Sequence, residues 1–294
     1  MLSKPQTFDG AREMAIFDAT RANASGDASR RLAALRGEIS AAYASYAQSV
    51  SPSGLTPILA QDDEANAAAL RTNYPKLRSG VQRNTGAELL RRSKKCCLCG
   101  HAPSGQLDHH LPKTAFPEFS ILTMNLIPVC ADCNHKKREL FRRSDGGPAF
   151  LHAYRDPLPD TEAFLVVDVA IEETVAADFR VVQTASITAS EFATLQHHFK
   201  SLELADLYGE LATELMGEKL TPIYEYFDEG GAEVVRHYLR LDARGAARRH
   251  GLNHWKRALL DALADDTEFC GGGFAALGGR AALAMPEASA PIRS

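Results

Sequence analysis

Long hydrophobic runs are absent from this sequence. No stretch of about eighteen apolar residues occurs, so we expect no membrane-spanning helix. The first ten residues have no apolar core after their lysine, and we therefore expect no secretory signal and a cytoplasmic protein. The glycine triplet at 271–273 lacks the lysine and the hydroxyl residue of a phosphate-binding loop, so it predicts only a turn.

Positive charge is not in excess either, but it is unevenly distributed. The chain has 33 Lys and Arg against 37 Asp and Glu, a net charge of −4 and a pI near 6.2. Residues 71–143 contain fourteen Lys and Arg and five Asp and Glu, whereas the rest contains nineteen and thirty-two. Such a cluster indicates a phosphate-binding surface, and a face that docks on a partner protein is the alternative.

Five of the six cysteines lie within thirty-eight residues and form two C-x-x-C pairs. Because disulfides are rare in the cytosol, this spacing predicts two knuckles that bind one tetrahedral ion. Zn²⁺ is favoured because it is borderline-soft and has no redox chemistry. Four thiolates leave it no open position, so the site should be structural. The predicted ligands are Cys96, Cys99, Cys130 and Cys133.

Two further cysteines need separate explanations. Cys97 is separated from Cys99 by a single residue, and both thiolates on one ion would be strained, so Cys97 is the alternative to Cys96 as a ligand. Cys270 lies far from the other five in the sequence. We expect it to be a buried apolar thiol.

Polar residues occur in a definite order between and after the two knuckles. Thirty residues separate Cys99 from Cys130, more than a plain zinc ribbon needs. They include Q-L-D-H-H-L-P-K from residue 106 and N-L-I-P-V from residue 125, and N-H-K-K-R follows Cys133. The pattern C-x-x-C, D-H-x-x-P, N-L-x-P-x-C, x-x-C-N-x-x-K resembles the HNH endonucleases, specifically their zinc-supported ββα-metal branch, over about residues 95–139.

These residue types suit the hydrolysis of a phosphodiester. The reaction needs a base that works near neutral pH and a cation that offsets charge on the leaving and non-bridging oxygens. A neutral imidazole can be the base, and a carboxylate with neutral oxygens can hold Mg²⁺. The resemblance implies that His109 is the general base, that Asp108 and Asn134 hold the metal, and that Asn125 braces the loop between the two strands and orients His109.

The assignment leaves alternatives at several positions. Consecutive residues of a regular strand face opposite ways, so Asp108 can hold the ion near His109 only if the strand is irregular or the metal sits at its edge. His110 is the rival of His109, and we assign it to packing or a backbone contact. Asn134 would open the helix, where it could act as an N-cap instead of a ligand. His135 is an alternative metal ligand, because other HNH enzymes have a histidine as third member.

Basic residues precede and follow the motif. We expect them to contact nucleic-acid phosphates, which raises affinity without reading bases, and a solvated helix face is the alternative. The predicted nucleic-acid-binding residues are Lys94, Lys95, Lys113, Lys136, Lys137, Arg138, Arg142 and Arg143.

The remaining sequence predicts mostly helices. Apolar residues recur every three or four positions from 28 to 50, which is typical of an amphipathic helix. Two strands joined by an acidic loop are expected at 164–171 and 179–182. A capping box at Thr188 and Glu191 should begin a helix, with later helices at 232–241 and 254–263.

We therefore expect an α+β, mostly helical protein with four parts. These are a helical N-terminal region (1–92), an HNH ββα-metal core stapled by the four-cysteine zinc site (93–145), a mixed, mostly helical C-terminal region (146–275) and a flexible tail (276–294). The C-terminal part is loosely similar to the tails of HNH proteins that accompany ATPases in bacterial defence systems such as Septu.

The predicted function is a metal-dependent endonuclease that cleaves DNA. Zn²⁺ would be structural, and Mg²⁺ or another divalent cation catalytic. The looser resemblance implies an anti-phage role with an ATPase partner. Because one such site cuts one strand, a double-strand break requires a homodimer or two successive events. The alternatives are an HNH-type RNase and a non-catalytic zinc module that docks on nucleic acid or on an ATPase.

Overall fold

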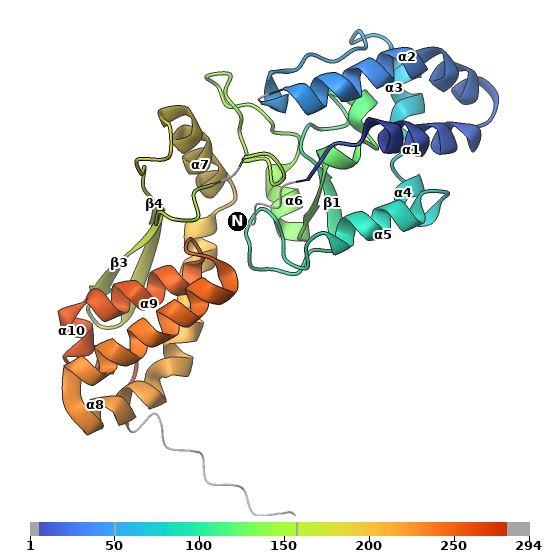
Figure 1. The fold of residues 1–294 in the computed structure, drawn as a ribbon. Helices are drawn as coiled ribbons and strands as arrows, with labels where there is room; N and C mark the ends of the chain where they lie inside the picture. Colours follow the sequence, from blue (N-terminus) through green and yellow to red (C-terminus); the bar gives the residue numbers. More distant parts are fainter. Residues whose placement is uncertain (1–5, 50, 157, 281–294) are drawn as a thin grey trace, which may run out of the picture. The chain divides into compact units, whose positions relative to one another are not determined.

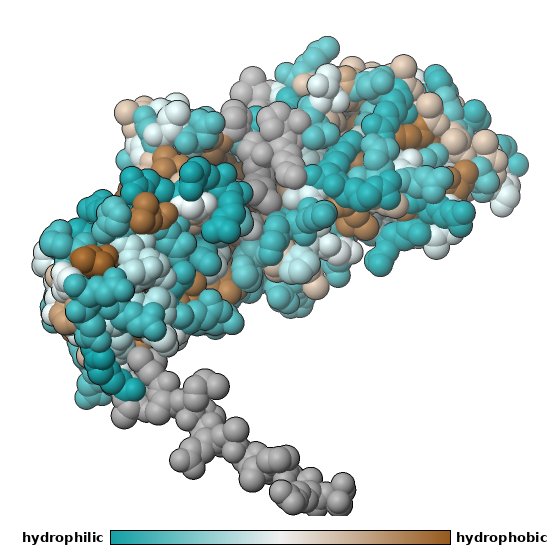
Figure 2. Space-filling view, turned by 60° about the horizontal axis from the view of Figure 1, so that its bottom comes forward, coloured by the Kyte–Doolittle hydropathy of each residue, from teal (hydrophilic) through white to brown (hydrophobic). Residues whose placement is uncertain are grey.

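A computed structural model describes residues 6–49, 51–156 and 158–280. They form helices and two two-stranded antiparallel sheets, so the α+β, mostly helical class is confirmed (Figure 1). The chain divides into two compact units, residues 1–158 with 187–202 and residues 159–186 with 203–294. No helix in the described ranges has both the length and the apolar character needed to cross a membrane. Figure 2 shows a mostly hydrophilic face on which hydrophobic residues are scattered.

The first unit begins with a helical segment. Its helices are α1 (Gly10–Ala22), α2 (Gly26–Gln48), α3 (Glu64–Arg71), α4 (Lys76–Ser79) and α5 (Arg83–Arg91), and a 3₁₀ turn, η1, covers Pro52–Gly54. Helix α2 corresponds to the predicted amphipathic helix, and it buries apolar side chains spaced three and four residues apart. The rings of Tyr43 and Tyr46 lie 6.4 and 5.0 Å from the ring of Phe119. Helix α2 therefore packs on the segment that joins the two strands of the first sheet.

A short hairpin followed by a helix forms the middle of the first unit. Strands β1 (Gln106–His109) and β2 (Leu126–Val129) pair antiparallel, and α6 (Ala131–Lys137) follows directly. The connection between the strands contains two 3₁₀ turns, η2 (Pro117–Phe119) and η3 (Thr123–Asn125). Cys130 is the N-cap of α6, since its sulfur accepts a hydrogen bond from the backbone of Cys133. The alternative that Asn134 caps this helix is therefore wrong, because Asn134 lies inside it.

Helix α7 (Ala189–Ser201) also belongs to the first unit. The predicted capping box is present, with reciprocal hydrogen bonds between Thr188 and Glu191. The ring of His198 makes a 3.0 Å hydrogen bond to the carbonyl of Leu98, which holds α7 against the first cysteine knuckle.

The second unit combines a hairpin with long helices. Strands β3 (Leu165–Ile171) and β4 (Val175–Val181) pair antiparallel, and β4 starts four residues earlier than predicted. The helices are α8 (Leu204–His250), α9 (Trp255–Asp265) and α10 (Thr267–Cys270), and a 3₁₀ turn, η4, covers Gly273–Leu277. Gly230 and Gly231 interrupt α8 with non-helical backbone angles, so the predicted helix at 232–241 lies in its second part.

The predicted boundaries at 92, 145 and 275 differ from those of the two units. Residues 1–158 form one unit because long-range polar contacts join the N-terminal helices to the hairpin. Glu13 of α1 accepts hydrogen bonds from the backbone and the hydroxyl of Thr123, and Tyr46 of α2 bonds to Asn125. The predicted region 146–275 is shared between the units. Residues 276 and 277 of the predicted tail belong to η4, and residues 281–294 lie outside the described residues.

Candidate metal centre and active site

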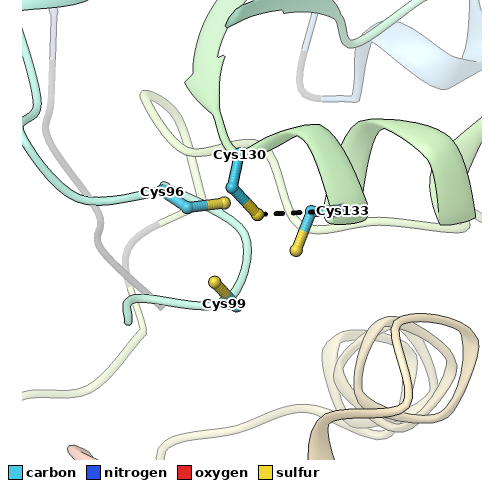
Figure 3. Close-up of side chains that lie close together, drawn as sticks. All are labelled: Cys96, Cys99, Cys130 and Cys133. Atoms are coloured by element: carbon cyan, nitrogen blue, oxygen red, sulfur yellow. Dashed lines mark hydrogen bonds between the residues drawn. The ribbon is translucent and has the colours of Figure 1, made fainter. Parts of the chain in front are cut away.

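Four cysteine side chains converge at the beginning of α6 (Figure 3). Cys96 and Cys99 come from the loop before β1, Cys130 follows β2, and Cys133 lies in the first turn of α6. All four are buried, and their sulfur atoms lie within 4.8 Å of one another. A tetrahedral Zn²⁺ site with Zn–S bonds of about 2.3 Å needs sulfurs about 3.8 Å apart. The cluster could thus hold a structural metal ion such as zinc, as predicted.

The backbone around the cluster prepares it for thiolates. Gly100 has a φ of +70°, and its N–H donates to the carbonyl of Cys96 at 2.8 Å, which closes the first knuckle. The backbone N–H of Cys133 lies 3.4 Å from the sulfur of Cys130. Contacts among the four thiols lower the pKa of Cys99 and Cys130 and raise the pKa of Cys96 and Cys133. Metal binding requires all four thiols to be deprotonated.

The other two cysteines lie outside the cluster, as expected. The backbone N–H of Cys97 donates to the carbonyl of Pro128 at 3.0 Å, which ties the knuckle to β2. Cys270 is fully buried, and its thiol donates to the carbonyl of Leu263 at 3.3 Å. The prediction of a buried apolar thiol at Cys270 is confirmed.

One face of β1 contacts α6 through two polar pairs. Gln106 and Asp108 alternate along the strand, and Asn134 and Lys137 lie nearly one turn apart on the helix. The amide nitrogen of Asn134 donates to the side-chain oxygen of Gln106 at 2.6 Å. The ammonium of Lys137 lies 3.0 Å from Oδ2 of Asp108 and donates to the carbonyl of His109 at 2.8 Å.

The Asp108–Lys137 ion pair is deeply buried. Lys137 is 1% exposed and Asp108 is 5% exposed. Burial raises the pKa of Asp108, and the positive charge of Lys137 opposes this shift. Although Lys137 is at ion-pair distance, Oδ2 of Asp108 has no hydrogen bond of acceptable geometry among the described groups. Oδ2 of Asp108 is thus buried beside the ammonium of Lys137 but accepts no well-aligned hydrogen bond from it.

The face of β1 that contacts α6 carries oxygen atoms of the type that bind divalent cations. Asp108 offers a buried carboxylate oxygen, and Asn134, whose amide nitrogen donates to Gln106, offers its side-chain oxygen. Mg²⁺ prefers such oxygens. Both side chains lie on the face shared by β1 and α6, and the Lys137 ammonium is the cation with which a divalent ion would compete.

His109 is on the other side of β1. Its Nε2 lies 2.9 Å from the carbonyl of Ser120, and its ring lies 4.5 Å from the ring of Tyr74. Because a carbonyl can only accept, Nε2 carries the proton and Nδ1 is the basic nitrogen. Burial lowers the pKa of His109 to about 3, and the charges of Lys113 and Lys137 add to this shift. The imidazole is therefore neutral at physiological pH.

The predicted site residues are only partly brought together. Asp108 and Asn134 share the face toward α6, but no contact among the described side chains joins the imidazole of His109 to either of them. Strand β1 pairs regularly with β2, so of the two arrangements considered above only a metal at the strand edge remains. His109 is the last residue of β1, where it pairs with Leu126 of β2. His135, the alternative ligand, is exposed on α6.

Asn125 holds the loop between the strands. It is fully buried, and its amide nitrogen donates to the carbonyls of Leu111 and Phe119 at 3.0 and 3.2 Å. Its side-chain oxygen accepts from the backbone of Leu111 at 2.8 Å and from the hydroxyl of Tyr46 at 3.2 Å. Its own carbonyl accepts from the backbone of His110 at 2.8 Å. These bonds fix the backbone immediately after His109.

His110 faces a buried partner that the sequence did not reveal. Its ring lies 4.3 Å from the ring of His152, and the hydroxyl of Tyr46 lies 2.9 Å from Nε2 of His152. Burial lowers the pKa of His152 to about 3. The packing role expected for His110 agrees with this position. No motif marks His152, since its partner Tyr46 is 106 residues away in the sequence.

The basic residues fall into two groups. Lys94, Lys95, Lys136 and Arg138 are exposed, although the ammonium of Lys136 donates to the carbonyl of Leu202 at 3.3 Å. The ammonium of Lys113 lies 4.7 Å from the centre of the Tyr74 ring. The remaining three predictions need correction, because these side chains are not exposed and have structural partners. Lys137 is in the buried ion pair, Arg142 donates to the carbonyls of Ser53 and Leu55, and Arg143 donates to Asp145, Pro148 and Thr194.

Comparison with known proteins adds one relative. The chain is 26% identical over 197 residues to the protein ea31 of Escherichia phage lambda. The alignment covers 62% of this chain and 65% of ea31, so it spans somewhat less than two thirds of the relative. No family model matches the chain, and no solved structure matches it significantly. The name of the relative states no activity, so the site itself must carry the functional argument.

Proposed function

We propose that this chain is an HNH-type, metal-dependent endonuclease that hydrolyses DNA. The observation that carries the proposal is the joint arrangement of the ordered motif. The four-cysteine cluster links the hairpin to α6. Asp108 of β1 faces α6, and Asn134 of α6 faces β1. The neutral imidazole of His109 lies at the end of β1. A cluster of this kind fixes strand and helix relative to each other, which a preorganised site requires.

His109 is the base in this proposal. The carbonyl of Ser120 holds the ring with Nδ1 unprotonated, so Nδ1 can take a proton from the attacking water. A pKa of about 3 keeps the imidazole neutral but makes it a weak base while the site is closed. An anionic phosphodiester next to the ring raises that pKa, because a negative charge favours the protonated form. Substrate binding thereby shifts the pKa of His109 in the direction that a general base requires.

Asp108 and Asn134 would hold the catalytic divalent cation, for which Mg²⁺ is favoured. When bound, the ion supplies positive charge that stabilises the leaving 3′ oxygen and the non-bridging oxygens. Water forms the new bond to phosphorus, the bond to the 3′ oxygen breaks, and that oxygen takes up a proton from solvent. The products are a 5′ phosphate and a 3′ hydroxyl. Asn125 acts as a positioning residue, because its bonds to the loop fix the backbone that carries His109.

A non-catalytic zinc module that docks on nucleic acid is the second candidate. The buried pair of Asp108 and Lys137 favours it, since this pair already supplies the carboxylate with a cation. His109 is only 7% exposed, and this burial also favours the non-catalytic module, because a general base must reach the substrate. An HNH-type RNase would use the same residues as the DNA endonuclease.

Nicking of supercoiled plasmid in Mg²⁺ tests the role of His109. We expect His109→Asn to lose at least about a hundredfold in rate, the contribution typical of a general base. His237→Asn is the matched control, because this histidine is exposed on α8 and has no role in the proposed site, so the rate should stay unchanged. Zinc content and thermal melting must stay at wild-type levels in both variants. A His109 variant that nicks at the wild-type rate rules out the mechanism, and cleavage of RNA alone favours the RNase.

An ATPase partner, a homodimer and a role in phage defence are part of the same proposal. The ATPase partner and the defence role rest on the loose similarity of the C-terminal part to defence-associated HNH proteins, whereas the homodimer rests on the need for two sites in a double-strand break. Co-purification of the tagged chain with an ATPase encoded beside it is the corresponding test, and light scattering of the purified chain reports the dimer.

A further inference from the structure

A groove lies next to the candidate site in the first unit. It is bounded by α4, α5 and the beginning of β1, and it encloses about 150 Å³. Its lining includes Tyr74, Arg78, Arg83, Gln106 and Leu107. This volume accommodates a small anionic group rather than a folded partner.

The walls of the groove are set by a close backbone contact. A Cβ atom at Gly86 of α5 would lie 1.9 Å from the carbonyl oxygen of Leu77 in α4. Only glycine allows the two helices to approach this closely. The backbone positions of Arg78, which lies in α4, and of Arg83, which begins α5, are therefore fixed by packing.

The two arginines of the groove differ from other arginines of this unit. Several exposed arginines pair with carboxylates, as Arg12 does with Glu88 and Arg36 does with Asp18. Arg78 and Arg83 are exposed, and neither guanidinium has an ion pair or a hydrogen bond to another described residue. No acidic side chain is among the described lining residues. Two guanidinium groups thus border a groove with no counter-charge, and a guanidinium matches the geometry of phosphate.

Two residues that line the groove, Tyr74 and Gln106, contact residues of the candidate site. The hydroxyl of Tyr74 donates to the carbonyl of Leu107 at 2.5 Å, and the ring of Tyr74 contacts the ring of His109. The ammonium of Lys113 covers the same tyrosine ring. Gln106 lines the groove and bonds to Asn134, the proposed metal ligand. Phosphates bound in the groove would therefore lie next to residues that contact the candidate site.

We infer that this groove binds the phosphodiester backbone of the DNA strand, with Arg78 and Arg83 contacting phosphates that adjoin the cleaved one. The inference rests on the proposed nuclease function, because it assigns the groove to the substrate of that site. Arginine contacts to phosphate raise affinity for any sequence and make it depend on salt. The groove therefore contributes binding and placement of the strand but no base recognition.

Fluorescence anisotropy with a short labelled DNA duplex tests the groove. The measurement is made on the zinc-loaded full chain without added Mg²⁺, so that cleavage does not interfere. Arg78→Gln combined with Arg83→Gln should weaken binding by roughly tenfold to sixtyfold at 0.1 M salt, and the slope of log K against log salt should become shallower by about 1.8. Arg30→Gln combined with Arg36→Gln on α2 removes the same charge and should leave both quantities unchanged.

The outcomes separate the groove from the nuclease proposal. If the wild-type protein cleaves DNA but the Arg78/Arg83 variant binds with unchanged affinity and slope, the groove inference is overturned and the nuclease proposal stands. An equal loss in the α2 variant also overturns it, because the effect is then one of net charge. If the variant loses binding while the wild-type protein fails to cleave, only catalysis is refuted. A wild-type chain that does not bind DNA refutes both.

Discussion

At the scale of single residues, Lys137 decides how the candidate site can work. The sequence places it in a basic run, where contact with phosphate is the natural expectation, but the structure buries it against Asp108. Asn134 and Lys137 are three positions apart and so lie on one face of α6. The proposed metal ligand and the lysine are therefore on the same side of the helix. A divalent ion at Asp108 must compete with this ammonium.

Substitution of Lys137 tests this competition. In zinc-loaded protein without Mg²⁺, Lys137→Met should lower the free energy of unfolding by about 3–5 kcal/mol, because Asp108 is left as an unpaired buried charge. Added Mg²⁺ or Mn²⁺ should restore more stability to this variant than to the wild type. The double variant with Asp108→Asn has neither charge and should not respond to the ion. Thermal melts that show the same ion response in all three proteins would contradict the assignment of Asp108.

The buried histidines should make the protein acid-sensitive. Burial, with the charge of Arg155, lowers the folded-state pKa of His152 to about 3, below the value of about 6.5 expected in the unfolded chain. The unfolded state therefore binds more protons between about pH 6.5 and pH 3, and the free energy of unfolding falls as the pH drops through this window. His109 has the same sign of shift.

Urea unfolding at pH 7 and pH 5 measures this effect. His152 should account for roughly 2 kcal/mol of the loss between the two pH values. His152→Gln should be less stable at pH 7, because the bond to Tyr46 is altered, but it should lose less on acidification. His135→Gln, at an exposed position, should show the wild-type pH dependence. Parallel pH profiles for wild type and His152→Gln would contradict the explanation.

At the scale of elements, the cysteine knuckles join loop, strand and helix. Cys96→Ser should lose bound zinc, about one ion per chain, together with a large part of the thermal stability, because metal binding and folding are coupled. Cys97→Ser is the matched control, since Cys97 lies outside the cluster. Elemental analysis and melting curves of the two variants provide the test. Zinc retained in Cys96→Ser but lost in Cys97→Ser would reverse the ligand assignment.

Local signals allowed these elements to be predicted. Two C-x-x-C pairs identify a four-thiolate cluster because only a fixed spacing lets two thiolates reach one ion. The capping box at Thr188 and the apolar spacing in α2 are also local and were confirmed. Contacts between distant residues could not be read in this way, such as the bond between Tyr46 and His152. To predict that Lys137 is buried, one would have to know which face of α6 packs on β1, and this depends on the residue at which the helix begins.

At the scale of the whole molecule, the predicted regions differ from the two units in both halves of the chain. The prediction divides residues 1–145 into two regions, although they lie in one unit, and it treats 146–275 as one region, although these residues lie in two. Residues 1–158 belong to one unit, in which the buried carboxylate of Glu13 in α1 accepts hydrogen bonds from Thr123 of the hairpin loop. In the second unit, the side chain of Asn253 accepts from the backbone of Phe164 and Leu165 and so ties the hairpin to the segment before α9. Residues 146–275 therefore belong to two units.

The central claim is that the first unit hydrolyses DNA with a divalent cation held at Asp108 and Asn134. The most direct measurement is the nicking of supercoiled plasmid by the zinc-loaded full chain as Mg²⁺ is raised. The account predicts nicked circles whose rate of formation rises with Mg²⁺ to saturation and falls to background in Asp108→Asn, with zinc still bound. No nicking at any Mg²⁺ concentration, or nicking that does not depend on Mg²⁺, would contradict it.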